Sequence, residues 1–264
     1  QDFAASGNGE SFNWMVVLDG HGGNKVTNTI VTLNPTIDWY SVLNHDTAQE
    51  IYNAIQCHYS KLGSTKGFGA TFVAAKIYPT HYDLYWAGDS PAWIFENNHS
   101  VFSSEIHNEL NKTEPTRLEA LPQQVLIHPT KKIQKRGENI IEQIPSSYFA
   151  FGPRDNISIS HSLGHQEITG KFLQHHRFTK TPGKQYKLLL CSDGLSDLFD
   201  PQTIPEDMAI IARDDLTADI LADFAEASWK KQWTFKVEGY ADSLATFPPD
   251  GYDDVAVALL VEDS

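Results

Sequence analysis

The chain of 264 residues is poor in the features that mark membrane and nucleic-acid-binding proteins. No apolar run approaches the roughly 18 to 20 residues that a membrane-spanning helix needs. Lysine and arginine together number 20 against 34 aspartates and glutamates, so the formal net charge is −14 at pH 7. Because nucleic acids and anionic membranes both bind clusters of Lys and Arg, this balance argues against either partner.

Cysteine is also scarce. Cys57 and Cys191 lack metal-ligand spacing and stand in apolar patterns, which predicts two buried free thiols in a reducing compartment. The first residues, QDFAASGNGE, lack the basic and then apolar pattern of a secretory signal, and no Met begins the chain. We therefore expect a cytoplasmic protein with a trimmed N-terminus.

Short strand-like segments are abundant, in a chain whose 41% hydrophobic content is typical of a folded globular protein. Residues 68–95 predict two or three consecutive antiparallel strands, with turns at 79–81 and 88–91. The segments are β-branched, aromatic or leucine-rich, and Gly, Pro, Asn or Asp bounds most of them: 14–18, 71–78, 82–87, 91–95, 157–161, 187–191 and 255–261.

Helix patterns lie between these segments. Residues 47–59 carry an apolar stripe after a Thr47 to Glu50 capping box, and a second stripe covers 216–228. A shorter helix is expected over 26–33. The polar stretch 103–139, interrupted by prolines, predicts a flap-like excursion rather than a linker, because strand patterns resume after it. We expect this excursion to hold the recognition surface. We predict one mixed α/β (α+β) domain over residues 1–264.

Aspartates mark the ends of several predicted strands. Asp19 and Asp193 each follow an apolar run, Asp89 follows another, and the pair Asp253-Asp254 precedes a fourth. Strands that pack side by side bring their ends together, so these carboxylates can form one cluster. Clustered carboxylates repel one another unless they share protons or bind cations, and Mg²⁺ and Mn²⁺ prefer such oxygen ligands. Each aspartate taken singly is better explained as a turn former, whereas for the set taken together both interpretations stay open at this point.

Seven segments in order resemble the metal-dependent protein phosphatases of type 2C. They are QDF, VVLDGHGG, GFGATFVAAKI, LYWAGDSPAWIF, ISISHSLGH, LLLCSDGLSDLF and YDDVAVALLV, which together span nearly the whole chain. The resemblance implies a four-layer α-β-β-α sandwich in which two antiparallel sheets are flanked by helices. It also implies metal-dependent hydrolysis of phosphoserine and phosphothreonine on proteins.

The resemblance assigns ligands for two ions, Mg²⁺ or Mn²⁺. Asp19 would bridge both ions, and the Gly20 carbonyl would bind one of them. Asp193 and Asp253 would hold the other. Two such ions activate a water for in-line attack on the phosphoryl group, without a covalent enzyme intermediate.

Three further residues receive roles by the same resemblance. Asp2 would act through waters, and Asp89 matches the residue that binds a weaker third ion in some members. His21 would donate the proton to the departing Ser or Thr oxygen, a role that imidazole suits near neutral pH. Outside this motif, a histidine after a strand is more often an exposed turn residue.

The sequence departs from the family pattern at several positions. Gln1 and Asp254 stand where many members carry Glu and Asn, and His161 and His165 replace an Arg and an Asp. The family's phosphate-binding Arg would precede Gln1. A degenerate phosphatase fold that serves as a binding or scaffolding module is therefore the alternative to an active enzyme. For the enzyme we expect a phosphoprotein substrate and a monomer.

Overall fold

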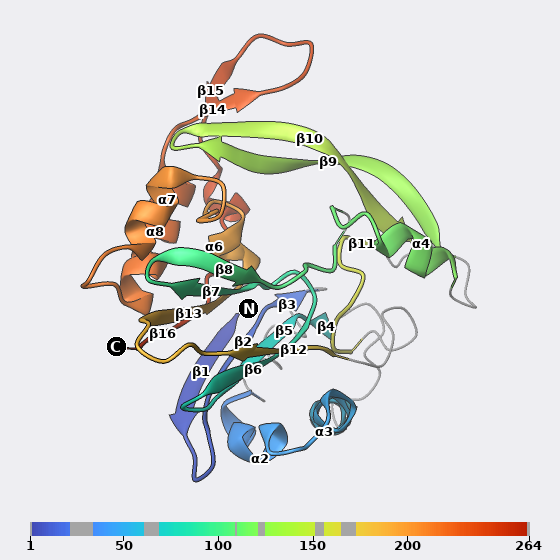
Figure 1. Cartoon of the computed structure of the whole chain (residues 1–264). Coiled ribbons are helices and arrows are strands. Elements are labelled where there is room, and N and C mark those ends of the chain that lie inside the picture. The colour runs from blue at the N-terminus through green and yellow to red at the C-terminus, as the bar shows by residue number, and fades with distance from the viewer. Residues whose placement is uncertain are drawn as a thin grey trace.

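Two antiparallel β-sheets form the centre of the structure, a computed structural model that describes residues 2–21, 34–60, 69–108, 110–120, 125–150, 156–164 and 173–262 (Figure 1). The strands of the first sheet, in spatial order, are β1 (Phe3–Asn8), β2 (Asn13–Leu18), β5 (Phe72–Ile77), β6 (His81–Ala87) and β12 (Gln174–Thr179). Those of the second sheet are β16 (Val257–Glu262), β13 (Tyr186–Cys191), β7 (Ala92–Glu96) and β8 (His99–Ser103).

The alternation of side chains along each strand builds a core on both faces of the sheets. On β2, Met15 and Val17 face the core between the two sheets, where they join Leu188 and Leu190 of β13. Their neighbours on β2 point to the opposite face. Full burial of one such aliphatic side chain contributes about 1.5–3 kcal/mol to stability. The two sheets therefore pack face to face, as expected from the sequence.

Helices cover the outer face of each sheet, which completes the four layers. Helices α2 (Trp39–Leu43) and α3 (Ala48–Ser60) pack on the first sheet. On the second sheet lie α6 (Asp193–Ser196), α7 (Pro205–Ile211) and α8 (Ala218–Lys230). The predicted α-β-β-α sandwich is confirmed.

Local sequence patterns explain where the two longest helices begin. The Thr47 hydroxyl accepts from the Glu50 backbone N–H at 3.2 Å, and the Glu50 carboxylate accepts from the Thr47 N–H at 3.0 Å, which is the expected capping box. The Thr217 hydroxyl caps α8 by accepting from the Ile220 N–H. Both helices lie within two residues of their predicted ranges.

A third, mixed sheet was not predicted. Its hairpin arches from the side of α7 to the region of α4 (Glu114–Glu119) (Figure 1). Its strands are β9 (Leu126–Gly137), β10 (Ile140–Ala150), β11 (Asn156–Ile157), β14 (Trp233–Lys236) and β15 (Ser243–Ala245). The short remaining elements are β3 (Gly20–His21), β4 (Gly69–Ala70), η1 (Asn34–Thr36) and η2 (Pro249–Gly251).

The segment 103–139 is more regular than its composition indicated. Pro115 stands at the start of α4, where a missing N–H costs no hydrogen bond. Pro129 lies in β9, which pairs only with β10 in the described part of the chain, and such an edge strand tolerates proline. Polar composition here reflects a strand with one free edge.

Two other sequence expectations were wrong, and a third holds in part. Residues 157–161 do not form a strand beyond Ile157, although Ile159 makes an isolated bridge to Asn108. Of the strands expected within 68–95, β5 and β6 pair antiparallel, whereas the turn at 88–91 carries the chain to β7 in the other sheet. Cys57 is exposed, whereas Cys191 is buried as predicted.

Two more points concern one expected helix and membrane-spanning helices. The helix expected over 26–33 lies outside the described residues. No helix in the described ranges is long and apolar enough to cross a membrane.

Candidate metal and active site

Strand pairing brings the predicted aspartates to one edge of the sandwich. The register pairs Phe3 with Leu18, so Asp2 just before β1 faces Asp19 just after β2. In the second sheet Cys191 pairs with Val257, which sets the first residue of α6 near the loop before β16. The four-residue connection between β6 and β7 supplies Asp89. Residues far apart in the sequence therefore lie along the same edge of the two sheets.

Two hydroxyl groups fix the backbone of Asp19 and Asp89 relative to each other. The Thr71 Oγ1 accepts from the Asp19 N–H at 3.0 Å, and the Thr71 N–H donates to the Asp19 carbonyl at 2.8 Å. The same hydroxyl shares a hydrogen bond with Ser90, the neighbour of Asp89. All of these groups are buried. Sequence reasoning missed Thr71 and Ser90, although both lie inside the quoted motifs.

Ser192 ties the end of β13 to the start of β16. Its Oγ accepts from the Ala256 N–H at 2.9 Å, and its own N–H donates to the Ala256 carbonyl at 3.0 Å. The next turn is tight, since a Cβ on Gly194 would lie 1.9 Å from the Asp254 carbonyl oxygen. The close approach therefore requires glycine, and it fixes Asp193 beside the loop that carries Asp253.

Burial and mutual repulsion raise the pKa of the central carboxyls. Burial is the main reason why the pKa of Asp19 lies well above its ordinary value, and the charges of Asp193 and Asp2 raise it further. Burial likewise raises the pKa of Asp193, with contributions from Asp89, Asp197 and other neighbouring carboxylates. A bound cation would relieve this repulsion.

Two further carboxyls belong to the same cluster. Burial raises the pKa of Asp2 to about 6, and the charge of Asp253 adds to this shift. Asp197 was not predicted from the sequence. Burial raises its pKa as well, opposed by Lys132 at 3.7 Å and increased by the charge of Asp89. Since Asp197 stands one helical turn after Asp193, the spacing in SDGLSD is the pattern that could have revealed it.

Four buried carboxylate oxygens in the cluster have no hydrogen-bond partner among the described residues. They are Oδ1 and Oδ2 of Asp2, Oδ1 of Asp89 and Oδ1 of Asp193. The other oxygen of Asp89 accepts from the Asn108 side-chain amide at 3.3 Å. Unpaired buried carboxylate oxygens and an all-oxygen donor set fit a hard divalent cation such as Mg²⁺ or Mn²⁺. Across the described residues, however, no three His, Cys, Asp or Glu side chains already converge as a closed ligand set.

His21 and Gly20 form β3, next to the cluster. β3 pairs with β4, with Gly20 opposite Ala70 and His21 opposite Gly69. Gly20 is buried and His21 is half-buried. Gln1 and His165, which depart from the family pattern, lie outside the described residues. Asp254 is exposed, and its N–H donates to Asp253 Oδ1 at 3.0 Å.

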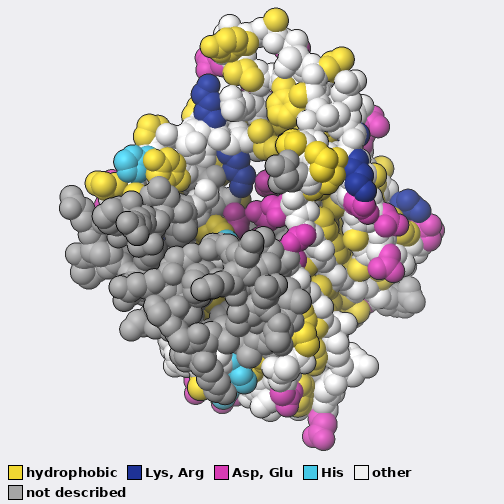
Figure 2. Space-filling model, turned by 180° about the vertical axis from the view of Figure 1, so that it is seen from behind, with side chains coloured by type: hydrophobic (Ala, Val, Ile, Leu, Met, Phe, Trp, Pro, Cys, Tyr) yellow, Lys and Arg dark blue, Asp and Glu magenta, His cyan; other side chains and the backbone are white. Residues whose placement is uncertain are grey.

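A cavity of about 460 Å³ opens beside the cluster. On the face shown in Figure 2, acidic side chains gather in a hollow with basic side chains above them. Strand β9 contributes Lys132 and Lys135 to the lining of the cavity, and the loop after β8 contributes Glu105 and Asn108. Asp89, Asp193, Asp197 and Asp200 line it as well.

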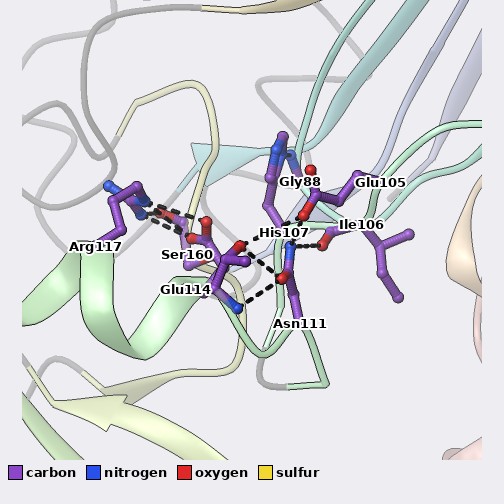
Figure 3. Close-up of polar contacts among 9 residues, drawn as sticks. Gly88, Glu105, Ile106, His107, Asn111, Glu114, Arg117 and Ser160 are labelled. Carbon is purple, nitrogen blue, oxygen red and sulfur yellow. Dashed lines mark hydrogen bonds and ion pairs between the residues drawn. The ribbon is translucent and has the colours of Figure 1, made fainter.

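The segment 105–117 is fastened to two of the family-like motifs (Figure 3). The Gly88 N–H donates to His107 Nδ1 at 3.2 Å, and the Ser160 N–H donates to the His107 carbonyl at 2.9 Å. Arg117 pairs with Glu114 and also donates to the Ser160 carbonyl at 2.8 Å. This part of the predicted excursion therefore forms a fixed wall next to Asp89.

The departure at His161 is a packing feature. Its ring lies 4.2 Å from that of His107, centroid to centroid, and both residues are buried. Burial lowers the pKa of His161 to about 2 and that of His107 to about 4. Both rings are therefore neutral near pH 7.

Solved structures with similar folds come from bacterial phosphatases and from a nematode. The chain matches serine/threonine phosphatase Stp1 from Staphylococcus aureus with a TM-score of 0.58 and 18% identity, over 100% of this chain and 94% of the other. It matches the Mycobacterium tuberculosis phosphatase PstP/Ppp with a TM-score of 0.53 and 15% identity, over 99% and 97%. The chain has the fold of the protein phosphatase 2C-like enzymes.

Two other solved structures have similar folds, also at low sequence identity. A C. elegans sex determining protein matches with a TM-score of 0.59 and 16% identity, over 98% of this chain but 60% of that one. A structure of the PstP catalytic domain in complex with 2 manganese ions matches with a TM-score of 0.51 and 14% identity, over 100% and 98%. No protein-family model and no curated protein sequence matches the chain. At these identities the likeness establishes the fold.

Proposed function

We propose that the protein is a Mg²⁺- or Mn²⁺-dependent serine/threonine phosphatase that acts on phosphorylated proteins. The observation that carries the proposal is the convergence of Asp2, Asp19, Asp89 and Asp193 on one edge of a phosphatase-like fold, with buried oxygens that lack donors. Such a cluster is costly without a cation, because each carboxylate raises the pKa of its neighbours. The solved phosphatase that carries two manganese ions supports the choice of metal.

The ligands proposed for the ions are those implied by the motifs. Asp19 and the Gly20 carbonyl would bind at the end of β2, and Asp193 and Asp253 would bind from the second sheet. Asp2 and Asp89 would act from the edges of the cluster. When bound, the ions would lower the pKa of a water and neutralise phosphoryl charge, which is the chemistry that two-metal hydrolases use.

The protein's own side chains are proposed to hold the metal ligands in place and to protonate the leaving oxygen. Hydrolysis forms a bond from a water oxygen to phosphorus and breaks the bond between phosphorus and the Ser or Thr oxygen, which leaves with a proton. His21, held by β3 at the rim of the cluster, is proposed to give that proton. Thr71 and Ser192 hold the backbone of the proposed ligands in place through the bonds described above.

The experiment is turnover of a generic aryl phosphate and of a phosphothreonine peptide, each with Mn²⁺ and with chelator. We expect release of phosphate from both substrates with Mn²⁺ only. The chain used should include any residues that precede Gln1 in the natural protein, because the family's phosphate-binding Arg would lie there. A protein that binds Mn²⁺ but releases no phosphate contradicts the enzyme.

The alternative is a phosphatase-like binding module without activity. The observation that favours it is the lack of a closed ligand set among the residues that the structure describes. Such a module needs no metal, so its melting temperature should be the same with and without chelator.

A further inference from the structure

The cavity beside the carboxylates has one wall that the predicted motifs do not provide. This wall is strand β9 of the hairpin, and Lys132 and Lys135 reach the cavity from it. The charged residues in the remaining lining are all acidic and come from three other segments, among them Asp89 and Asp193. A phosphorylated substrate that enters this cavity would meet its positive side chains on β9.

The two lysines differ in what they do. Lys135 is buried and donates to both oxygens of Asp207, at 2.6 and 2.8 Å, so this ion pair stabilises the attachment of β9 to α7. Lys132 lies 3.7 Å from Asp197, and the two side chains are 20% and 22% exposed. This separation is longer than either contact of Lys135 with Asp207, and it exceeds the usual length of a hydrogen bond. A dianionic phosphate could therefore draw the Lys132 ammonium away from Asp197.

We propose that Lys132 binds the phosphate group of the substrate from the β9 wall of the cavity. The inference rests on the proposed function and adds to it a residue that contacts the substrate. Lysine suits this role because its ammonium is a compact charge with three donors on a flexible stem. Once divalent ions neutralise the carboxylates, the ammonium and the ions would attract the same phosphoryl group.

Lys131 provides the matched control on the same strand. It carries the same charge as Lys132, is exposed, and does not line the cavity. The variants are therefore K132A, K132R, which keeps the positive charge, and K131A. Each is assayed with Mn²⁺ on a phosphothreonine peptide, with inorganic phosphate as a competitive inhibitor, and each is melted to verify that the fold is retained.

We expect K132A to raise the KM for the peptide and the inhibition constant of phosphate about tenfold, because it removes one charged hydrogen bond, while kcat changes less than twofold. K132R should recover most of the affinity, and K131A should match the parent. If the parent is active and K132A has the same KM and inhibition constant as the parent, the role of Lys132 is overturned and the proposed phosphatase is not.

A direct binding measurement separates this inference from the proposed function. Calorimetric titration of the Mn²⁺-loaded protein with inorganic phosphate needs no turnover. If the parent releases no phosphate from any substrate, the proposed phosphatase is wrong, whereas a tenfold loss of phosphate affinity in K132A still supports the site. Unchanged affinity in K132A overturns it.

Discussion

The two walls of the cavity arise in different ways. The carboxylate wall holds residues directly beside strand ends, such as Asp89 and Asp193, and the register of two antiparallel sheets places Asp19 next to them. The β9 wall depends on a hairpin that joins the rest of the molecule through the parallel pair of β10 with β14 and through the ion pair of Lys135 with Asp207. The proposed metal chemistry belongs to the first wall, and the proposed phosphate contact of Lys132 belongs to the second.

Loss of a ligand from the carboxylate wall should have the largest effect. We expect D193N to reduce kcat about a thousandfold or more, because catalysis by metal ions contributes several kcal/mol to transition-state stabilisation. The fold should remain cooperative, since the change is isosteric. The measurement is steady-state aryl phosphate turnover, and near-normal activity would remove Asp193 from the ligand set.

The second-largest effect is expected at Gly194, where the backbone of α6 lies close to the Asp254 carbonyl oxygen. A Cβ there would collide with the Asp254 carbonyl oxygen, so G194A must separate α6 from the loop before β16. We expect a loss of about 1–3 kcal/mol in the free energy of unfolding together with a marked loss of activity. Denaturant unfolding measures the first. The control is G183A, a position with nothing within 4 Å of the added Cβ but with positive φ, so its cost is conformational. If G194A costs no more than G183A, the close approach is not maintained in solution.

The proposed proton donor, His21, can be tested separately from the proposed metal ligands. H21Q should slow hydrolysis about a hundredfold for substrates with poor leaving groups and little for activated aryl phosphates, because only the former need a proton in the transition state. A leaving-group series checks this. Equal slowing throughout the series would contradict the acid role.

The smallest effect on activity is expected at Thr71, which holds the backbone of Asp19 and has no proposed contact with the substrate. T71V keeps the shape but loses the hydrogen bond to the Asp19 N–H. We expect about 1–3 kcal/mol lower stability, because a buried donor is left unpaired. Affinity for Mn²⁺ should also fall, as calorimetry can measure. T71S, which keeps the hydroxyl, is the control, and its behaving like T71V would show that packing of the methyl group matters more than the bond.

The same comparison explains what could be predicted from the sequence. The strands that end just before Asp19 and Asp193, and helix α8, were predicted within two residues, because apolar runs, caps and glycine turns are local signals. The hairpin was missed because β9 is polar and has one free edge, and its attachment to β14 links residues far apart in the chain. Lys132 carries no local signal that distinguishes it from Lys131.

Within the site, the resemblance supplied the candidate ligands and the structure supplied what holds them. Thr71, Ser90 and Ser192 act through hydrogen bonds between motifs, and such pairings depend on tertiary packing. Asp197 was omitted although its spacing from Asp193 fits one helical turn. The roles of His21 and of the metal ligands remain predictions.

The most direct test of the central claim, that the carboxylate wall binds divalent ions, is the melting temperature of the parent and of D193N with Mn²⁺ and with chelator. Ions at about 100 times their dissociation constant stabilise a protein by roughly 2.7 kcal/mol per site, or about 5 to 10 °C for a chain of this size. We predict that Mn²⁺ raises the melting temperature of the parent by at least this amount and that of D193N much less. In chelator, D193N should melt at or above the parent, because the substitution relieves repulsion within the cluster. The account would be contradicted if Mn²⁺ left the melting temperature of the parent unchanged and if D193N melted below the parent in chelator.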